Sequence, residues 1–574
     1  MKLNGAQILW ECLVREGVEV VFGITGGAVL PIYDEMPKYP IHHVTMRHEQ
    51  AAAHAADGYA RATGKVGVCL ATSGPGATNL VTGIATAQMD SSPIVAITGQ
   101  VATSALGTDG FQEVDTTGIT LPITKHNYLI TNVRDLARSV REAFYIARTG
   151  KPGAVLIDIA KDAQQAECEF EYPDQVYLPG YRPHVRGNPR QIKQAAEMIN
   201  AAQRPVIIAG RGVLIAHAEE ELRTLAEKAH IPVVTTLLGK SALPETHPLC
   251  LGMGGMHGEA YANLAMQEAD LIFGIGTRFD DRLTSTASTF APKAKIIHAD
   301  IEPAEISKRI RVDVPIVGDA RNVLQALLPL VHEAEHTEWL ECIAKWREDT
   351  LAHDILWQET DELVPQYVIR TIWEATCGEA LMVTDVGQNQ MWEAQYYLHN
   401  RPRGLISSGG LGTMGFALPA AIGVAMGRPD CRVWVVTGDG GFQMTLQELA
   451  TVMQEKLPLK IAILNNGFLG MVRQWQELFY NKNYSGSPLL GPDFVKLAEA
   501  YGIPGLRVTK KEEVVEAVQQ AEAMEGPVLI DFQIEQEHNV YPIVPVGQPI
   551  HQMIRRPIRA RAQSAACERQ GGEA

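Results

Sequence analysis

Residues 432–466, RVWVVTGDGGFQMTLQELATVMQEKLPLKIAILNN, decide how the chain folds. The stretch opens with an apolar, β-branched run at 433–437 and closes with a second such run, and residues 444–455 carry apolar side chains at helical spacing. This order predicts a βαβ unit. Because both strands of a parallel pair end at the same edge of the sheet, we expect Asp439 and Asn466 to lie close together.

The polar ends of these two strands have the chemistry of a metal and diphosphate site. Carboxylate and amide oxygens are hard ligands, and Mg²⁺ prefers a few of them together with diphosphate oxygens. A GDG triplet alone is more often an ordinary turn, but GDG and NN at the ends of two buried-type strands resemble the cofactor motif of thiamine diphosphate enzymes. The resemblance implies that Gly438 and Gly440 approach the diphosphate, and that Mg²⁺ is bound by Asp439, Asn466 and the backbone carbonyl of Phe468.

Length and composition describe a soluble globular protein and exclude several classes of function. A chain of 574 residues is too long for one core, and about 150 residues per domain predicts three or four domains. The net charge of −16 argues against a nucleic-acid partner or an anionic membrane surface. No run approaches the roughly 18 apolar residues that span a bilayer, and the N-terminal segment lacks a signal-peptide pattern. The eight cysteines show no CxxC spacing, so we expect reduced thiols and a cytoplasmic location.

Helical and strand patterns alternate along most of the chain, which predicts an α/β protein of three doubly wound parallel-sheet domains. We place an N-terminal domain at 1–173 and a central domain at 190–335, joined by a linker rich in proline, tyrosine and glycine. A C-terminal domain follows at 364–554, and the polar residues 555–574 are expected to be disordered. The strand, glycine turn, helix and strand at 70–100 repeat the pattern of the opening stretch, which indicates that the first and third domains are related.

Glu49 stands in the segment RHEQAAAHAADGYARATG. Taken alone, it is typical of a helix-dipole glutamate on a solvated face. The alanines that follow are small enough for close packing, so a carboxyl here is expected to be buried and active in proton transfer. Thiamine chemistry needs a carboxyl that exchanges a proton with the aminopyrimidine ring. By resemblance to the RHEQ motif of that family, Glu49 is predicted to be this catalytic group.

The segment ALGTDGFQEVDTTGITLPITKHNY, residues 105–128, is either a surface loop or a mobile wall of an active site. Its FQE and ITKHN elements resemble those of the acetohydroxyacid synthases, also called acetolactate synthases. The resemblance implies that Phe111 lines the substrate pocket, that Gln112 is catalytic, and that catalytic Lys161 of the GKPGAVLIDIAKD segment enters the pocket. A glycine turn near the N-terminus, GITGGAVLPIYD, resembles a loop beside the reacting carbon, which places Gly27 at the cofactor and Ala28 at the substrate.

The central domain carries the features of a dinucleotide site. An apolar strand precedes GRGV, which either cradles a pyrophosphate or forms a common turn, and Asp300 at the end of KIIHAD is suited to accept a ribose hydroxyl. The family resemblance identifies the dinucleotide as FAD, bound in part at Gly210 and Gly212. Arg278 of RFDDR is either in an ion pair with the adjacent aspartates or, as the resemblance implies, in contact with flavin and substrate. The resemblance also places Met253 in the substrate pocket.

The C-terminal domain supplies further predicted contacts around the opening stretch. VTDVGQNQMW ends a strand in a polar turn whose Gly387 and Gln388 are expected to bind diphosphate oxygens. In SSGGLGTMGFALPAAIG, the resemblance implies that the carbonyl of Gly412 meets the amino group of the cofactor and that Met414 bends the cofactor; ordinary core packing is the alternative for this methionine. Trp475 of QWQ belongs to an apolar helix stripe, and in the family this tryptophan narrows the acceptor pocket and favours 2-oxobutyrate over pyruvate.

The resemblance extends in collinear order over about residues 4–555. It implies the catalytic subunit of a biosynthetic acetohydroxyacid synthase that uses thiamine diphosphate, Mg²⁺ and FAD. Such an enzyme decarboxylates pyruvate and joins the two-carbon unit to pyruvate or to 2-oxobutyrate, at the first common step toward valine, leucine and isoleucine. Family architecture brings Glu49 of one subunit to the diphosphate held by Asp439 of another, so a homodimer is the minimum, with a tetramer as the larger state. A small regulatory subunit is a further expected partner.

Three alternatives remain at this point. A flavin-dependent pyruvate oxidase shares the three-domain plan, but the RFDDR and QWQ elements argue against it. A non-catalytic paralogue that serves as a binding subunit is disfavoured by intact Glu49, Lys161, Asp439 and Asn466. A catabolic acetolactate synthase without flavin is disfavoured by the RFDDR element.

Overall fold

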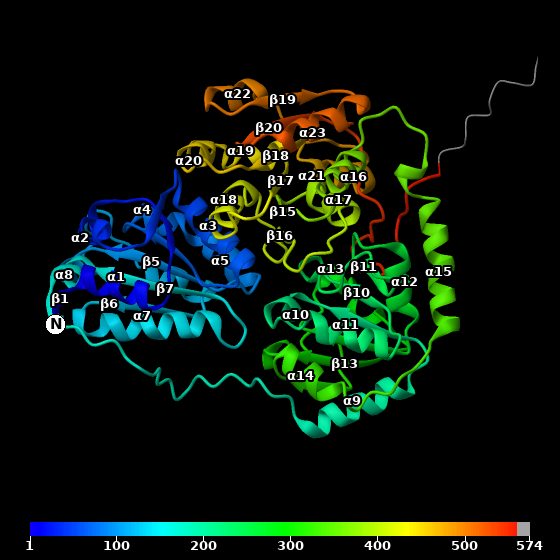
Figure 1. Ribbon diagram of the computed structural model, residues 1–574, viewed down its shortest axis with the longest axis horizontal. Coiled ribbons are helices and arrows are strands. Elements are labelled where there is room, and N and C mark those ends of the chain that lie inside the picture. The colour runs from blue at the N-terminus through cyan, green and yellow to red at the C-terminus, as the bar shows by residue number, and fades with distance from the viewer. Residues whose placement is uncertain (559–574) are drawn as a thin grey trace, which may run out of the picture.

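Three parallel β-sheets of six strands each organise residues 1–558, the part of the chain that the computed structural model describes. Figure 1 shows the N-terminal sheet at the left, the C-terminal sheet at the top and the central sheet at the lower right. Each sheet has a hydrophobic cluster on both faces, so each is covered by helices on two sides. The predicted fold class, three doubly wound parallel-sheet units, is confirmed.

The N-terminal sheet has the strand order β3-β2-β4-β5-β7-β6, and every neighbouring pair is parallel. Its strands are β2 (Val20–Gly23), β3 (His42–Thr45), β4 (Gly67–Ala71), β5 (Ile94–Gln100), β6 (His126–Ile130) and β7 (Ala154–Ala160). Its helices are α1 (Gly5–Arg15), α2 (Leu30–Glu35), α3 (Glu49–Thr63), α4 (Pro75–Asn79), α5 (Val81–Met89), α6 (Thr116–Thr120), α7 (Val133–Arg148) and α8 (Lys161–Gln165). A short antiparallel pair, β1 (Lys2–Asn4) with β8 (Glu167–Glu169), fastens the N-terminus to the end of this unit.

The central sheet has the strand order β11-β10-β9-β12-β13-β14 and is also parallel throughout. Its strands are β9 (Pro205–Ala209), β10 (Val233–Thr235), β11 (Cys250–Met253), β12 (Leu271–Ile275), β13 (Lys295–Asp300) and β14 (Val314–Val317). The helices are α9 (Pro189–Ala201), α10 (Arg211–Ile215), α11 (Glu219–Lys228), α12 (Ala260–Glu268), α13 (Asp281–Thr284) and α14 (Ala320–Leu327). The segment between β8 and α9 contains neither helix nor strand, as the linker composition predicts (Figure 1).

The C-terminal sheet has the strand order β16-β15-β17-β18-β20-β19. Its strands are β15 (Leu381–Thr384), β16 (Leu405–Ser407), β17 (Val433–Gly438), β18 (Lys460–Asn465), β19 (Gly505–Val508) and β20 (Val528–Gln533). The helices are α16 (Pro365–Thr376), α17 (Gln388–Tyr396), α18 (Ala417–Gly427), α19 (Asp439–Gln443), α20 (Leu449–Gln454), α21 (Gly470–Phe479), α22 (Phe494–Ala500) and α23 (Val514–Ala523). A long helix, α15 (Thr337–Leu351), leads from the central unit toward this one along one side of the molecule (Figure 1).

The opening stretch forms the predicted parallel pair, with Gly438 of β17 opposite Leu464 of β18. The single helix expected at 444–455 is wrong in its extent. Helix α19 begins at Asp439, directly after the strand, and the chain reaches α20 only through a separate 3-10 turn, Leu446–Glu448. Thr445 leaves the helical conformation with φ −138° and its hydroxyl donates to the carbonyl of Gly415 at 3.1 Å, so a tertiary contact replaces the local helix.

The N-terminal and C-terminal sheets share one hydrophobic cluster because α3 and α18 pack against each other between them. Ala51–Ala53, Ala55 and Ala56 of α3 are completely buried. A Cβ on Gly58 would lie 2.1 Å from the carbonyl oxygen of Ala420, and one on Gly423 would lie 1.8 Å from that of Ala55. The two helices therefore approach backbone to backbone, and only glycine fits at the crossing.

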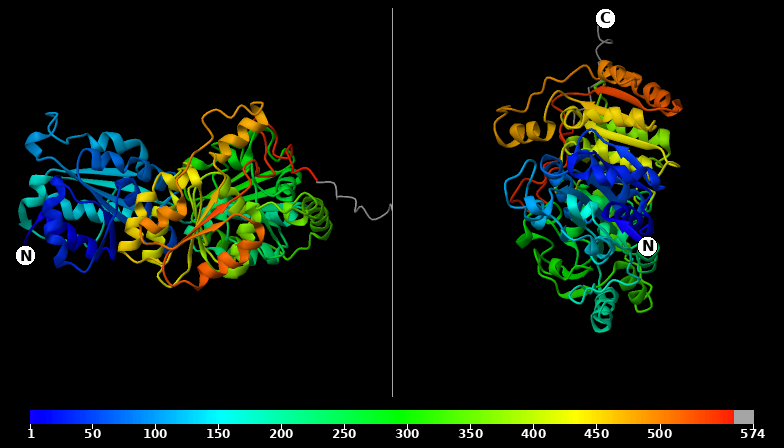
Figure 2. Two further views of the ribbon diagram at one scale, coloured as in Figure 1. Left: turned by 90° about the horizontal axis from the view of Figure 1, so that it is seen from above. Right: turned by 90° about the vertical axis from the view of Figure 1, so that its left-hand side faces the viewer.

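No helix within residues 1–558 is both long and apolar enough to cross a membrane. Of the predicted tail, 555–574, the structure describes the first four residues, and Arg555 forms an ion pair of 2.6 Å with Asp349 of α15. Residues 559–574 lie outside the described part. The left-hand view of Figure 2 shows the N-terminal unit at one end of the molecule, next to the C-terminal unit.

We expect Gly423→Ala to destabilise the protein by at least about 1–3 kcal/mol, the usual cost of overpacking, because the backbone of α3 blocks the added methyl group. The midpoint of thermal unfolding measures the change. Gly526→Ala is the matched control, since a Cβ there meets nothing within 4 Å. Equal midpoints for the two variants would contradict the close helix crossing.

Candidate active site

Each sheet has one point where the strand order reverses, and ligands of open α/β sheets bind outside the carboxyl ends of the strands at this point. The reversals lie between β2 and β4, between β9 and β12, and between β15 and β17. The glycine turns singled out in the sequence directly follow these six strands. Tertiary structure therefore places the predicted cofactor residues at three sheet edges suited to ligands.

The corner after β17 and β18 contains an unsatisfied acceptor. Asp439 is 2% exposed, its Oδ1 has no hydrogen-bond partner, and burial raises the pKa of its carboxyl to about 6. Asn466, which directly follows β18, accepts from the backbone N–H of Phe468 through Oδ1 at 3.1 Å. A buried carboxylate oxygen without a partner is costly, and a divalent cation that binds this oxygen together with a diphosphate would satisfy it. The donor set therefore fits Mg²⁺.

Asn466 is oriented by Gln388 at the start of α17. Its Nδ2 donates to Gln388 Oε1 at 3.2 Å. The amide nitrogen of Gln388 in turn donates to Gln474 Oε1 at 2.8 Å and to the carbonyl of His538 at 2.9 Å. Gln388 is 3% exposed, and its hydrogen bonds connect Asn466 to helix α21 and to the segment that contains His538. Its predicted contact with diphosphate stays a prediction.

The segment that carries Gly412 and Met414 is held by Asp385, a residue that the sequence reasoning missed. The Asp385 carboxylate accepts from the backbone N–H groups of Val386, Gly415 and Ala417 at 2.9–3.1 Å, and burial raises its pKa to about 6. An acidic residue directly after β15, at the reversal of strand order, was the available signal.

Gly412 has φ +73° in this segment, a conformation that glycine adopts readily, and Gly387 at the start of α17 has φ +139°. The Met414 methyl lies 3.7 Å from where a Cβ on Gly440 would be, so the methionine reaches the glycine turn after β17.

A cavity of about 920 Å³ lies where the three units meet. Its volume is at the upper end of the range of about 300–1,000 Å³ for ligand sites. Walls from all three units surround it. Seven predicted site residues line it: Gly212, Met253, Arg278, Asp300, Gly387, Gly412 and Trp475. Further lining residues lie outside the predicted set, among them Met89, Asp90, Leu411 and Met471.

Two charged residues that line this cavity, Arg278 and Asp300, were predicted from the sequence. Arg278 forms an ion pair of 3.3 Å with Asp280, as one reading of RFDDR expected, and also faces the sulfur of Met89 at 3.4 Å while lining the cavity. Asp300 accepts from the N–H of Glu302 at 2.9 Å, and burial raises the pKa of its carboxyl to about 6. A guanidinium and a buried carboxyl are suited to a carboxylate substrate and to ribose hydroxyls, respectively.

The GRG glycines have a packing reason of their own. A Cβ on Gly210 would lie 2.1 Å from the carbonyl oxygen of Gly276, and one on Gly212 would lie 2.5 Å from the Cα of Gly276. These glycines bring the turn after β9 against the turn after β12 at the reversal of the central sheet. Gly212 then faces the cavity, whereas Gly210 is not among the lining residues.

The predicted residues of the N-terminal unit do not reach this cavity within one chain. Glu49, Ala28, Phe111, Gln112 and Lys161 are absent from its lining. Glu49 begins α3, is half-buried, and accepts from Asn79 Nδ2 at 2.9 Å. Phe111 is 90% exposed. The predicted metal and diphosphate residues after β17 and β18 are also absent from the lining. The structure thus separates the predicted site into residues that line the cavity, the corner that holds Asp439 and Asn466, and a group at the edge of the N-terminal sheet.

A buried network supports the second group. Asp158 near the end of β7 is 1% exposed and accepts from Thr98 Oγ1 at 2.7 Å and from Gln100 Nε2 at 2.9 Å. The Gln100 amide also donates to the carbonyl of Val114 at 2.9 Å, in the loop that bears Gln112. Gln112 itself has φ +58°, and the loop backbone lies against the Gly74 turn. The network therefore fixes the Gln112 loop against the ends of β5 and β7.

Comparison with known proteins is consistent with this geometry. Three thiamine pyrophosphate enzyme models match the chain: the N-terminal TPP binding domain at 3–119, the central domain at 192–327 and the C-terminal TPP binding domain at 385–532. The acetolactate synthase of Mycobacterium bovis is 50% identical over 558 residues, which cover 95% of this chain and 90% of that protein. The acetolactate synthase large subunit of Corynebacterium glutamicum is 51% identical over 558 residues, 95% and 89% of the two chains. A probable acetolactate synthase large subunit of Methanocaldococcus jannaschii is 48% identical over 570 residues, 97% and 96%.

The stability of the N-terminal unit should depend on pH through Asp158. Burial raises the pKa of this carboxyl from 3.8 to about 7, so the folded state holds the proton more tightly than the unfolded chain does. Its contribution to stability is therefore complete below about pH 4 and is lost as the pH rises through about 7. Asp158→Asn mimics the protonated form and removes this titration.

We expect the melting temperature of the wild type to fall relative to that of Asp158→Asn between pH 5.5 and pH 8.5, measured by differential scanning fluorimetry. Asp430→Asn is the control, because that carboxyl is exposed and pairs only at the surface. If the melting temperatures of the wild type and of Asp158→Asn changed with pH in the same way, this carboxyl would not titrate with a raised pKa in the folded protein.

Proposed function

The chain belongs to the acetolactate synthase family of thiamine pyrophosphate enzymes, and on this premise we propose that it is the catalytic subunit that joins two 2-oxoacids. Pyruvate loses carbon dioxide, and the remaining two-carbon unit is ligated to pyruvate, giving 2-acetolactate, or to 2-oxobutyrate, giving 2-aceto-2-hydroxybutyrate. These two compounds are the products of the first common step in the biosynthesis of branched-chain amino acids. Thiamine diphosphate, when bound, supplies the nucleophilic carbon and the electron sink for decarboxylation.

The observation that carries the proposal is the unpartnered Asp439 Oδ1 at the reversal point of the C-terminal sheet, beside a cavity that opens between the three units. Asp439, Asn466 and the carbonyl of Phe468 would hold Mg²⁺, and the Gly438–Gly440 turn would receive the diphosphate at the start of α19. Asp385 keeps the Gly412 carbonyl and the Met414 side chain in place for the rest of the cofactor.

The cavity residues bind and select the 2-oxoacids. The Arg278 guanidinium is positioned to pair with a substrate carboxylate. Trp475, Met471 and Met253 give the acceptor pocket a narrow apolar wall, which excludes water and favours the extra methyl group of 2-oxobutyrate. We assign the part of the cavity between the turns after β9, β12 and β13 to FAD, with Gly212 at the pyrophosphate and Asp300 at the ribose.

The catalytic group Glu49, Gln112 and Lys161 acts, in this proposal, on the cavity of a second copy of the chain. Its support is that these residues lie outside the cavity of their own chain and that neighbouring Phe111 is 90% exposed. Glu49 would exchange a proton with the aminopyrimidine ring, and Lys161 would bind substrate. A homodimer is then the smallest active unit. The large-subunit names of relatives favour a small regulatory subunit as an additional partner, and we place the enzyme in the cytoplasm.

Acetolactate formation from pyruvate by the purified protein tests the reaction, with thiamine diphosphate, Mg²⁺ and FAD each omitted in turn. We expect product only with the complete set, and a preference for acetohydroxybutyrate when 2-oxobutyrate competes. Trp475→Leu should lower this preference about tenfold, because the acceptor pocket widens. Acetyl phosphate or peroxide instead of a ligation product would favour a pyruvate oxidase, and an inert cofactor complex would favour a non-catalytic paralogue.

Mixing two inactive variants tests the two-chain site. Glu49→Gln and Asp439→Asn should each be nearly inactive alone. In a hybrid dimer one site carries both substitutions and the other carries neither, so co-refolded or co-expressed chains should regain activity, up to about a quarter of the wild-type sites. A mixture of Asp439→Asn with Asn466→Ala is the control, since both changes lie on the same side of the site. Equal activities of the two mixtures would contradict a shared site.

A further inference from the structure

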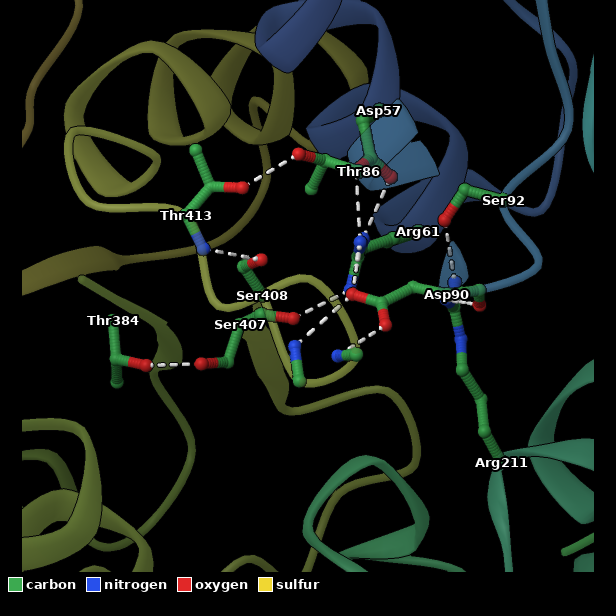
Figure 3. A network of polar contacts seen from close by, with 12 residues as sticks. Asp57, Arg61, Thr86, Asp90, Ser92, Arg211, Thr384, Ser407, Ser408 and Thr413 are labelled. Carbon is green, nitrogen blue, oxygen red and sulfur yellow. Dashed lines mark hydrogen bonds and ion pairs between the residues drawn. The ribbon is translucent and has the colours of Figure 1, made fainter. Parts of the chain in front are cut away.

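Asp90 lies where the three units meet and is not used by the reaction as proposed. It directly follows α5 of the N-terminal unit, its side chain is 1% exposed, and its neighbours in space come from the central and C-terminal units (Figure 3). Met89, Asp90 and Ser91 also form part of the cavity wall. A buried carboxylate at such a junction requires partners, and they are all identified by the structure.

The Asp90 carboxylate holds the beginning of residues 407–414, the segment that presents Gly412 and Met414. Oδ1 accepts from the N–H of Gly410 at 2.7 Å, and Oδ2 accepts from the N–H of Gly409 at 3.1 Å. Through these two bonds the N-terminal unit fixes the backbone of the C-terminal unit.

Arg61 of α3 adds further hydrogen bonds to this contact between the N-terminal and C-terminal units. Its guanidinium donates to Asp57 at 2.6 and 2.8 Å, to Asp90 Oδ2 at 2.9 Å, and to the carbonyl of Ser407 at 2.6 Å (Figure 3). Arg61 therefore contacts the 407–414 segment directly and also fixes the carboxylate that holds the following two residues.

The far end of the 407–414 segment is anchored by hydroxyl groups. Thr413 shares a hydrogen bond of 2.8 Å with Thr86 of α5, and its N–H donates to Ser408 Oγ at 3.0 Å. Ser407 Oγ in turn shares a bond of 2.6 Å with Thr384. The turn at Leu411 and Gly412 is therefore anchored on both sides, in part by residues of the N-terminal unit.

Arg211 connects the same point to the central unit. Its guanidinium donates to the carbonyl of Asp90 and, at 3.0 Å, to Ser92 Oγ. Arg211 precedes Gly212 on the turn after β9. This contact therefore joins that turn to Asp90, whose carboxylate holds the 407–414 segment. Asp57, Arg61 and Asp90 are buried and Arg211 is half-buried, and the four charges sum to zero.

We propose that Asp90 is a positioning residue: it holds the 407–414 segment in the conformation that binds thiamine diphosphate, and through Arg211 it makes this conformation depend on the central unit. The inference rests on the proposed function, because it concerns the same cofactor. Asp90 itself touches no reacting atom. Its role is to fix the backbone from which the Gly412 carbonyl and the Met414 side chain project.

Asp90→Asn tests the role with little change in shape. One oxygen is replaced by an N–H₂ group that faces donors from Gly409 or Arg61, and the junction is left with an unbalanced positive charge. Thiamine diphosphate with Mg²⁺ is titrated against protein containing FAD, with tryptophan fluorescence as the signal. We expect the dissociation constant to rise about 10- to 100-fold, the usual effect of losing a group that orients a ligand site.

Glu245→Gln is the matched control. Glu245 is a buried carboxylate in another seam between units, where it pairs with Lys240 and accepts from the N–H of His399 at 2.7 Å. Within residues 1–558 it forms no hydrogen bond or ion pair with the 407–414 segment. Both variants should lower the melting temperature, but only Asp90→Asn should weaken cofactor binding. Thr86→Val removes the hydroxyl bond to Thr413 and gives a milder variant, which should shift the same constant in the same direction.

The outcomes are separable. If the wild type neither binds thiamine diphosphate nor forms acetolactate, the proposed function fails. If the wild type does both while Asp90→Asn and Thr86→Val bind the cofactor as Glu245→Gln does, only the positioning role is overturned. If Asp90→Asn does not fold, Thr86→Val decides. A higher dissociation constant, together with the melting temperature of the wild type, supports the positioning role. An unchanged dissociation constant contradicts it.

Discussion

The architecture depends on the close crossing of α3 and α18. Because a glycine on each helix faces the other helix's backbone, the N-terminal and C-terminal sheets pack on a common layer and share one hydrophobic cluster. The same crossing brings the end of α5 to the 407–414 segment and positions Arg61, one turn from Gly58, against Ser407. If the two helices were further apart by the width of a methyl group, the Arg61 guanidinium could not reach the carbonyl of Ser407.

Three reversals of strand order then determine where chemistry is possible. The turns after β9, β12 and β15 line one cavity, whereas the turns after β2, β4 and β17 do not line it. One chain therefore presents two incomplete surfaces, a cavity with Arg278 and Trp475 and an edge with Glu49 and Gln112. This division is a consequence of sheet orientation and is the physical basis for a site shared between copies.

Four buried aspartates illustrate how burial is matched to role. Asp385 and Asp90 are each satisfied by backbone N–H groups and hold loops in place. Asp158 is satisfied by side chains and fixes the Gln112 loop, at the cost of a pKa near 7. Asp439 alone among these four keeps an unpartnered oxygen, and this difference distinguishes a ligand for a cation from a structural carboxylate.

The sequence by itself determined the βαβ order of residues 432–466, the three α/β units and the placement of Asp439 and Asn466 at neighbouring strand ends, because apolar periodicity and glycine turns are local signals. It misjudged the helix after β17, since Thr445 bonds to Gly415 from another segment. Asp90, Asp158 and Asp385 were missed, because the partners that give them their roles, apart from the adjacent Val386, lie 29 or more residues away. Only the tertiary structure could decide which strand ends open into one cavity and which buried carboxylates find donors, because burial and hydrogen bonding are properties of segments brought together by folding.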